Sequence, residues 1–221
     1  MRPLLKVMGL LALVFASTFV VARLLGVLTE ENVRNSLQAA SEVSPLWLAG
    51  IVFVLLFVDI LVAVPTLTIT LLAGYFLGFP LAFAVTFAGT ASAAFTGYAL
   101  SARYGGRAIA WIVGGRQADL VTAFRTHGPV MILLSRAAPM VPEITACMAG
   151  ATRLGLVRYA ALFALSTAPY VGIASYAGSI STWSDPGPAL FSSILLYATL
   201  WTGWAIFRRR MRNAERTQET G

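Results

Sequence analysis

The sequence has little charge and few of the side chains that enzymes and metal sites use. Charged residues make up 11% of the 221 residues and hydrophobic residues 58%, with a mean hydropathy of +0.78, whereas about a quarter of a soluble domain is charged. Cys147 is the only cysteine and His127 the only histidine, which excludes an intrachain disulfide and a cysteine or histidine metal cluster. No G-x-S-x-G or H-E-x-x-H element occurs. We therefore expect an integral membrane protein without cofactor, metal or enzymatic activity.

The net charge of +7 is explained by membrane topology rather than by a nucleic-acid partner, because the basic residues are scattered between apolar runs without a stacking aromatic cluster. Thirteen of the sixteen lie in four segments: 1–6, 103–127, 151–158 and 208–221. If these segments are cytoplasmic, the positive-inside rule is satisfied and the acidic stretches 29–45 and 181–188 face outward. The prediction is a multi-pass protein of the cell (plasma) membrane with both termini in the cytoplasm.

The apolar runs divide the chain into membrane segments of about 20 residues. The predicted order is a first transmembrane helix over 1–28, an external linker helix over 29–45, a core over 46–180, a last transmembrane helix over 181–207 and a basic cytoplasmic tail over 208–221. The first segment also resembles a signal peptide, but its apolar stretch is long enough to span and is expected to be retained. Within the core, 81–102 and 159–180 are expected to be full spans.

Two runs in the core are interrupted by proline, which removes a backbone donor and breaks a helix. Run 46–80 must begin and end outside, is too long for one helix, and contains Pro65 near its centre. Run 128–150 must begin and end inside and contains Pro139 and Pro142. Each run therefore predicts a re-entrant hairpin, and the two hairpins enter from opposite faces.

Each predicted hairpin is followed by a full span, and the two pairs run in opposite directions, which is the outline of an inverted repeat common in transporters. Bent backbone at membrane depth is tolerated only inside protein or beside a wet cavity. The predicted fold class is an all-α integral membrane protein, an inverted repeat with two opposed re-entrant helical hairpins plus about four full transmembrane helices, enclosing a polar site.

Three ionisable residues lie inside the apolar runs: Asp59, Arg136 and Glu143. An Asp or Arg at a helix centre costs about 2.5 to 3.5 kcal/mol on insertion scales, so these residues are expected to face inward and partner one another. Arg136 paired with Asp59 or Glu143 would keep guanidinium donors available for a phosphate, and a neighbouring carboxylate would exchange a proton. The alternative is a fixed ion pair that only joins the hairpins.

Hydroxyls and small residues complete the candidate site. Thr66, Thr68 and Thr70 follow the break at Pro65, where they either cap exposed amides or line a polar path. Small residues at four-residue spacing allow close helix approach. The glycines predicted to pack helices are Gly74, Gly78, Gly89, Gly97 and Gly150.

Two ordered blocks, V-D-I-L-V-A-V-P-T-L-T-I-T-L-L-A-G-Y-F-L-G over 58–78 and L-L-S-R-A-A-P-M-V-P-E-I-T-A-C-M-A-G over 133–150, carry a resemblance to a known family. The first is similar to the acid, proline and glycine-closed hairpin of the DedA superfamily, the VTT-domain proteins once called SNARE-associated, and the second to its R-x-x-P-x-x-P hairpin. The chain most resembles the TVP38-like branch. The resemblance implies two opposed re-entrant hairpins, with Asp59 as hairpin acid and Arg136 as hairpin arginine.

The resemblance also implies movement of lipids between leaflets. The leading hypothesis is a membrane lipid translocator, either a scramblase or a polyprenyl-phosphate carrier lipid flippase, with a midplane polar site. A proton-coupled small-solute transporter and a non-transporting membrane scaffold are the alternatives. The expected partners are membrane lipids or lipid phosphates, with protons as a further candidate and a homo-oligomer allowed for; nucleic acid is not expected.

Overall fold

A computed structural model describes residues 9, 10, 13, 17, 44–60, 64–105, 117–138, 140–182 and 187–219 of the chain. Every regular element in these ranges is a helix. The predicted first transmembrane helix 1–28 and the linker 29–45 lie almost entirely outside the described residues, and so does Pro139.

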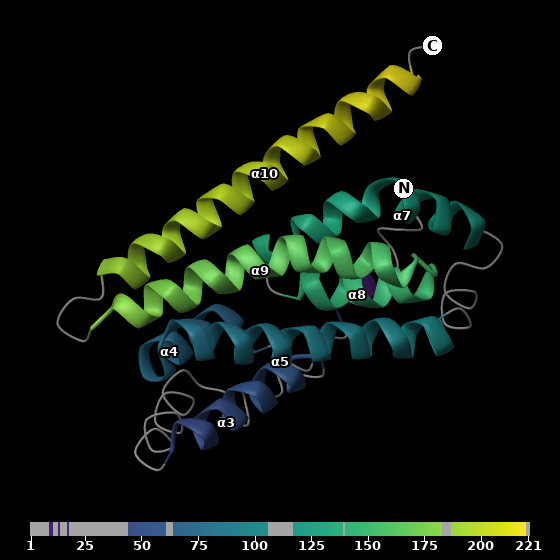
Figure 1. Cartoon of the computed structure of the whole chain (residues 1–221). Helices are drawn as coiled ribbons and strands as arrows, with labels where there is room; N and C mark the ends of the chain where they lie inside the picture. Colours follow the sequence, from purple (N-terminus) through teal and green to yellow (C-terminus); the bar gives the residue numbers. More distant parts are fainter. Residues whose placement is uncertain are drawn as a thin grey trace.

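The helices follow one another along the chain as labelled in Figure 1. They are α3 (Pro45–Val58), α4 (Thr66–Leu77), α5 (Phe79–Leu100) with the π-helical turn η1 (Ser101–Gly105), α7 (Gln117–Leu133), the 3-10 turn η3 (Ser135–Ala137), α8 (Val141–Ala151), α9 (Leu156–Ile180) and α10 (Gly187–Glu219).

Three helices are long and apolar enough to cross a bilayer. They cover Phe79–Gly105, Leu156–Ile180 and Gly187–Ile206, and 20 residues at 1.5 Å each span about 30 Å of hydrocarbon. The all-helical membrane fold is therefore confirmed, with long apolar helices at the predicted spans 81–102, 159–180 and 181–207. Helix α10 continues to Glu219, so most of the predicted tail 208–221 is helical.

The two interrupted runs form short helices separated by non-helical breaks. In the first run, α3 and α4 have 14 and 12 residues, which extend about 21 and 18 Å and do not cross a bilayer. In the second run, α7 starts at Gln117, inside the segment 103–127 that we assigned to the cytoplasm, and α8 has only 11 residues. Both breaks support the hairpin prediction, while the re-entrant path itself stays a prediction.

The second arm of each interrupted run packs against the long span of the other half of the protein. Helix α4 lies along α9, and α8 lies along α5 and η1. A Cβ on Gly74 would clash with the carbonyl oxygen of Ser175, one on Gly178 with that of Leu71, and one on Gly150 with that of Tyr98. The two halves are therefore interlocked through glycine contacts on both sides.

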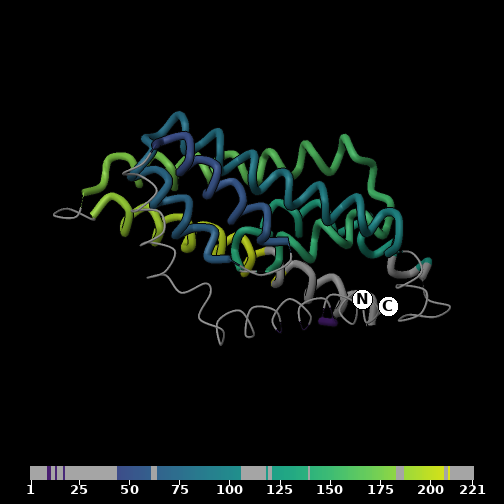
Figure 2. The backbone as a smooth tube through the Cα atoms, turned by 90° about the horizontal axis from the view of Figure 1, so that it is seen from below, coloured from purple at the N-terminus to yellow at the C-terminus, as the bar shows by residue number. Residues whose placement is uncertain are grey.

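The other predicted packing glycines behave differently from one another. A Cβ on Gly89 would lie 3.0 Å from Leu56 Cβ of α3, and one on Gly97 would lie 2.6 Å from Ile60 Cδ1. Figure 2 shows α3 running beside α5, where these glycines allow the close approach. A Cβ added to Gly78 would meet no atom within 4 Å, and Gly78 has a φ of 75°. It therefore serves the turn between α4 and α5 rather than helix packing.

Two hydrophobic clusters flank the breaks. One joins α3, α4 and the start of α5 and includes Leu56 and Ile69. The other joins α7, α8 and α9 to α5 and includes Ile144 and Tyr159. Asp59 lies between Leu56 and Val64 of the first cluster along the chain, and Glu143 directly precedes Ile144 of the second, so each cluster borders one charged residue of the site.

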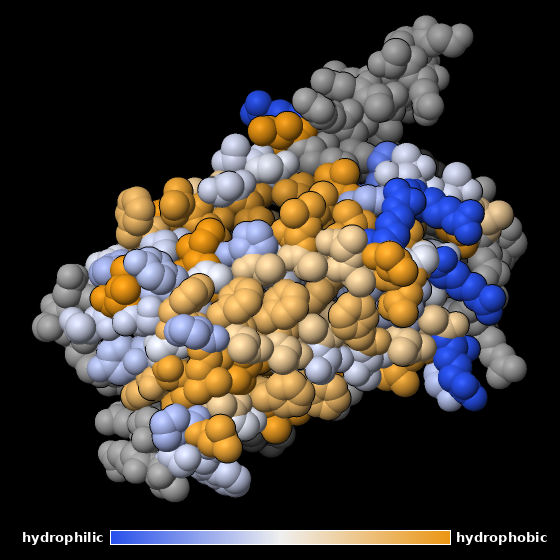
Figure 3. All heavy atoms as spheres, in the orientation of Figure 1, coloured by the Kyte–Doolittle hydropathy of each residue, from blue (hydrophilic) through white to orange (hydrophobic). Residues whose placement is uncertain are grey.

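Charged side chains gather at one end of the molecule, where α5 ends and α9 begins, shown in blue on the right of Figure 3. The exposed arginines of these segments are Arg103, Arg125, Arg153 and Arg158. The same end is fastened by a hydrogen bond from the Tyr98 hydroxyl to the Leu154 carbonyl. The described residues 103–105 of the first arginine-rich segment and the segment 151–158, which we assigned to the same side of the membrane, therefore lie at the same end.

Candidate functional site

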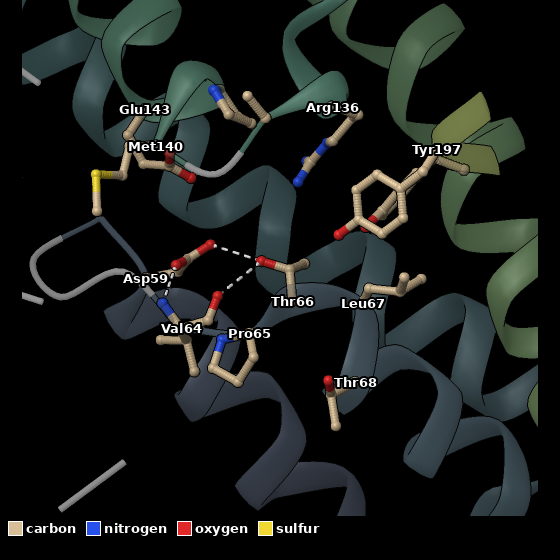
Figure 4. Close-up of a pocket in the computed structure, with 13 residues that line it drawn as sticks. Asp59, Val64, Pro65, Thr66, Leu67, Thr68, Arg136, Met140, Glu143 and Tyr197 are labelled. Carbon is tan, nitrogen blue, oxygen red and sulfur yellow. Dashed lines mark hydrogen bonds between the residues drawn. The ribbon is translucent and has the colours of Figure 1, made fainter. Parts of the chain in front are cut away.

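A cavity of about 400 Å³ lies where the two breaks face each other. Its wall receives at least one residue from each break and from four helices: Asp59, Thr66 of α4, Arg136 of η3, Glu143 of α8, Tyr170 of α9 and Tyr197 of α10. Figure 4 shows Asp59 and Thr66 on one side and Arg136 and Glu143 on the other. A second space of about 10 Å³ is bounded by the same three ionisable residues. The structure thus brings all three together.

Asp59 is 5% exposed and both of its carboxylate oxygens are engaged within the first break. Oδ1 accepts a hydrogen bond from the Val64 amide at 2.7 Å, and Oδ2 accepts one from the Thr66 hydroxyl at 3.1 Å. Val64 precedes the start of α4, and the carboxylate supplies the acceptor for its buried N–H. Asp59 therefore connects the end of α3 to the start of α4.

Arg136 is 7% exposed and is held by α9. Its Nη2 donates to the Thr167 hydroxyl at 3.2 Å, and its guanidinium carbon lies 5.6 Å from the centre of the Tyr170 ring. Its buried Nε has no hydrogen-bond partner. Among the described residues, no ion pair within 4.0 Å joins Arg136 to a carboxylate, so the direct pairing expected from the sequence is not observed, because Asp59 is engaged by its own break.

Glu143 lies in the first turn of α8 and is 9% exposed. Its buried Oε2 has no hydrogen-bond partner. The turn before it is tight, with Met140 at a φ of 68° and Pro142 within the first two helical positions, where the missing N–H of proline is harmless. A buried polar atom without a partner is costly, and such atoms concentrate where a ligand or proton binds.

The two short helices α4 and α8 both begin at the cavity. The first amides of a helix have no intrahelical acceptor, and the helix dipole makes this end favourable for an anion. Leu67 and Thr68 of the first turn of α4 line the cavity, as do Pro142 and Glu143 of α8. With Arg136 between them, the cavity has three sources of positive potential facing two carboxylates. This arrangement suits an anion that takes the place of a carboxylate beside Arg136, or an anion that enters together with a proton.

The three predicted threonines have different positions. Thr66 and Thr68 line the cavity. Thr70 is fully buried, and its hydroxyl donates to the Thr66 carbonyl oxygen at 2.7 Å within the same helix, a back-bond that hydroxyl residues often make in helices. Of the predicted polar lining, Thr70 therefore belongs to the interior of α4.

Sequence reasoning missed the residues that hold Arg136. Thr167 and Tyr170 are three residues apart and so share a face of α9, and Tyr197 reaches the same cavity from α10. The sequence feature that could have indicated them is a hydroxyl residue and an aromatic residue, Thr167 and Tyr170, at helical spacing beside Pro169 in an otherwise apolar span.

A family model of the VTT domain matches residues 64–180, which is more than half of the chain. The match runs from the residue before Pro65 to the end of α9 and includes Arg136, Glu143, Thr167 and Tyr170. It leaves Asp59 and all of α10 outside. No curated protein and no solved structure matches the chain. The arrangement of broken and spanning helices and this match lead to one conclusion: the chain belongs to the VTT-domain family, whose domain is that of the DedA membrane proteins.

Proposed function

We propose that the protein is a lipid translocator that carries the phosphate-bearing headgroup of a lipid through the cavity between the two breaks. The main observation is that Arg136 is buried and that its Nε has no hydrogen-bond partner. It lines a cavity of about 400 Å³ at which two helices begin. Membership of the DedA family, generally a non-enzymatic membrane family, supports a transport role.

Phosphate suits this cavity better than a neutral headgroup. A guanidinium presents several donors in one plane and binds phosphate oxygens bidentately. Helix N-termini add backbone donors and a favourable dipole. A phosphate in the cavity would compensate the buried positive charge of the Arg136 guanidinium, whose Nη2 donates to the Thr167 hydroxyl.

Part of the cavity wall is exposed at the surface, which suits a lipid whose hydrocarbon chains remain in the membrane. Pro65, Thr66, Leu67 and Thr68 on its wall are half-buried, and Tyr197 of α10 is 39% exposed. A headgroup entering past Tyr197 needs no aqueous route through the whole protein. A passive scramblase and a flippase for a polyprenyl-phosphate carrier would both use this geometry.

Reconstitution tests the proposal. Liposomes containing the purified chain and a fluorescent phospholipid are treated with an external quencher. Quenching beyond that in liposomes without the protein shows that inner-leaflet lipid has reached the outer leaflet, which measures scrambling. Surface exposure of the polyprenyl-phosphate carrier in cells measures the flippase form. We expect Arg136→Ala to abolish the response and the exposed Arg158→Ala to retain it. If neither response changes in Arg136→Ala or Asp59→Asn, the proposal is wrong.

The two buried carboxylates support a second candidate, a proton-coupled transporter of a small solute. Asp59 and Glu143 line the same cavity as Arg136, and a carboxylate without a full set of partners is suited to exchanging a proton. This function predicts uptake that stops when an ionophore collapses the proton gradient. Passive lipid scrambling would continue under the same treatment.

The proposed orientation is that of a plasma-membrane protein with the arginine-rich end in the cytoplasm, which the positive-inside rule favours. Thr126 and Thr182 are exposed on segments expected on opposite sides. In a chain with Cys147→Ser, Thr126→Cys should react with an impermeant thiol reagent only from the cytoplasmic side and Thr182→Cys only from outside. The reverse pattern would contradict the orientation.

A further inference from the structure

A second, apolar cleft lies directly beside the arginine turn. It has a volume of about 90 Å³ and is formed by Leu134, Ala137, Ala138 and Val141 on one side and by Trp201 and Trp204 of α10 on the other. Ala138 lines both this cleft and the polar cavity. Ala137 and Ala138 are also the two residues that follow Arg136 in the chain, so the cleft starts where the guanidinium is anchored.

One face of α10 forms a wall of both spaces. Tyr197 faces the polar cavity, and Trp201 and Trp204 face the cleft. These residues are spaced by four and three positions and therefore lie in one row on the helix. At 1.5 Å per residue, the cleft is displaced from Tyr197 by about 6 to 10 Å along α10. That offset corresponds to the distance between a headgroup and the first part of its chain.

We propose that this cleft holds the first methylene groups of a single hydrocarbon chain whose phosphate lies at Arg136, an assignment that rests on the lipid-translocator function. The occupant is thus one lipid chain entering between the second break and α10. The cleft is smaller than the ~150 Å³ that accommodates a benzene molecule, so it fits a few methylenes. The remainder of the chain continues past Trp201, which is 58% exposed, into the lipid.

The cleft selects by shape, because membrane lipid is as apolar as its walls and transfer of a chain from lipid into the cleft gains little hydrophobic energy. A single slim chain fits beside Ala137 and Ala138, whereas bulk close to the phosphate would meet the tryptophans of α10. Helix α10 would thereby determine which lipid phosphates reach Arg136, although it lies outside the matched VTT domain.

Photo-crosslinking of the full chain in lipid nanodiscs tests this placement. The probes are two dodecyl phosphates, one with a diazirine near the phosphate and one with it at the far end of the chain. We expect the first probe to label residues 134–141 or 201–204, and glycerol 3-phosphate to compete with it. The second probe should label surfaces that face lipid. If the first probe labels residues outside the cleft and glycerol 3-phosphate still prevents this labelling, that result contradicts the chain site in the cleft and leaves the phosphate site intact. Labelling that glycerol 3-phosphate does not compete with contradicts the phosphate site itself.

A pair of tryptophan substitutions gives an independent measurement. Val141→Trp adds bulk to the cleft, and Leu195→Trp places the same new side chain at a position on α10 that is 51% exposed. We expect Val141→Trp to weaken dodecyl phosphate binding about tenfold, the usual result of overfilling a packed site, with glycerol 3-phosphate binding unchanged. Leu195→Trp should change neither. Unchanged dodecyl phosphate binding in Val141→Trp overturns the proposal.

Discussion

The first and second breaks bury their charged residues equally but satisfy them differently. Asp59, Arg136 and Glu143 are 5%, 7% and 9% exposed. In the first break both oxygens of Asp59 accept hydrogen bonds from its own loop and helix. In the second, Arg136 Nε and Glu143 Oε2 have no partner. Burial alone therefore does not identify the binding group; unsatisfied donors and acceptors do.

The buried charges have two candidate roles, a structural one and a binding one. This difference assigns the structural role to the first half and the binding role to the second. The structural role, in which a charge only holds the protein together, fits Asp59, whose carboxylate connects α3 to α4. The binding role fits Arg136, which is positioned by Thr167 and Tyr170 and retains an unused donor. The following predictions test this division.

Arg136→Gln is expected to have the largest effect, and on binding rather than on stability. Truncating one partner of a buried charged contact costs about 2 to 5 kcal/mol of binding, so phosphate-lipid transport should fall by about 30-fold or more. The melting temperature should change little, because the substitution also removes a buried charge with an unpaired donor. Thermal unfolding and liposome transport measure the two effects. Arg158→Gln, at an exposed position, is the control; a large drop in melting temperature for Arg136→Gln alone would indicate a structural role.

Glycine substitutions should affect both halves alike, because the packing is similar even though the polar chemistry differs. In Gly74→Ala and Gly150→Ala the new methyl would meet the carbonyl oxygens of Ser175 and Tyr98, and overpacking costs about 1 to 3 kcal/mol. Gly50 lies in α3, and a Cβ added there would meet no atom within 4 Å. Gly50→Ala should therefore be neutral or stabilising. Fluorescence-detected size-exclusion chromatography after heating measures the order. Equal stability of all three variants would show that the halves do not interlock through these glycines.

Asp59→Ala should destabilise the protein by about 1 to 3 kcal/mol, because it leaves the Val64 amide without its acceptor and leaves the Thr66 hydroxyl only the Val64 carbonyl oxygen, at 3.3 Å. Asp59→Asn should recover most of this loss, since the amide oxygen still accepts from Val64 and the amide nitrogen can donate to the Thr66 oxygen. Melting temperatures of the two variants provide the test. An Asp59→Asn protein that is stable but inactive in transport would show that the charge itself is used, which contradicts a purely structural acid.

The sequence predicted the features with local causes and missed those that depend on distant partners. Helices restart at Pro65 and around Pro142 because proline restricts its own backbone and removes its own donor. Burial of Asp59, Arg136 and Glu143 in one cavity follows from the cost of charge in hydrocarbon. The contact between Arg136 and Thr167 spans 31 residues, and no local pattern specifies it. The pairing of Arg136 with a carboxylate was expected because opposite charges attract, but a threonine and a tyrosine on α9 hold the guanidinium instead.

Two neighbouring threonines should give the smallest effects and sharpen the definition of the first break. Thr66→Val removes the hydrogen bond to Oδ2 of the buried Asp59 and the longer one to the Val64 carbonyl oxygen, so a loss of about 1 kcal/mol is expected. Thr70→Val removes only a back-bond to the carbonyl of its own helix, which already has its helical partner, so the loss should be smaller still. Both substitutions keep the β-branched shape, and chemical denaturation in detergent compares them directly. If Thr70→Val were the more harmful, the hydroxyl inside α4 rather than the one at Asp59 would stabilise the first break.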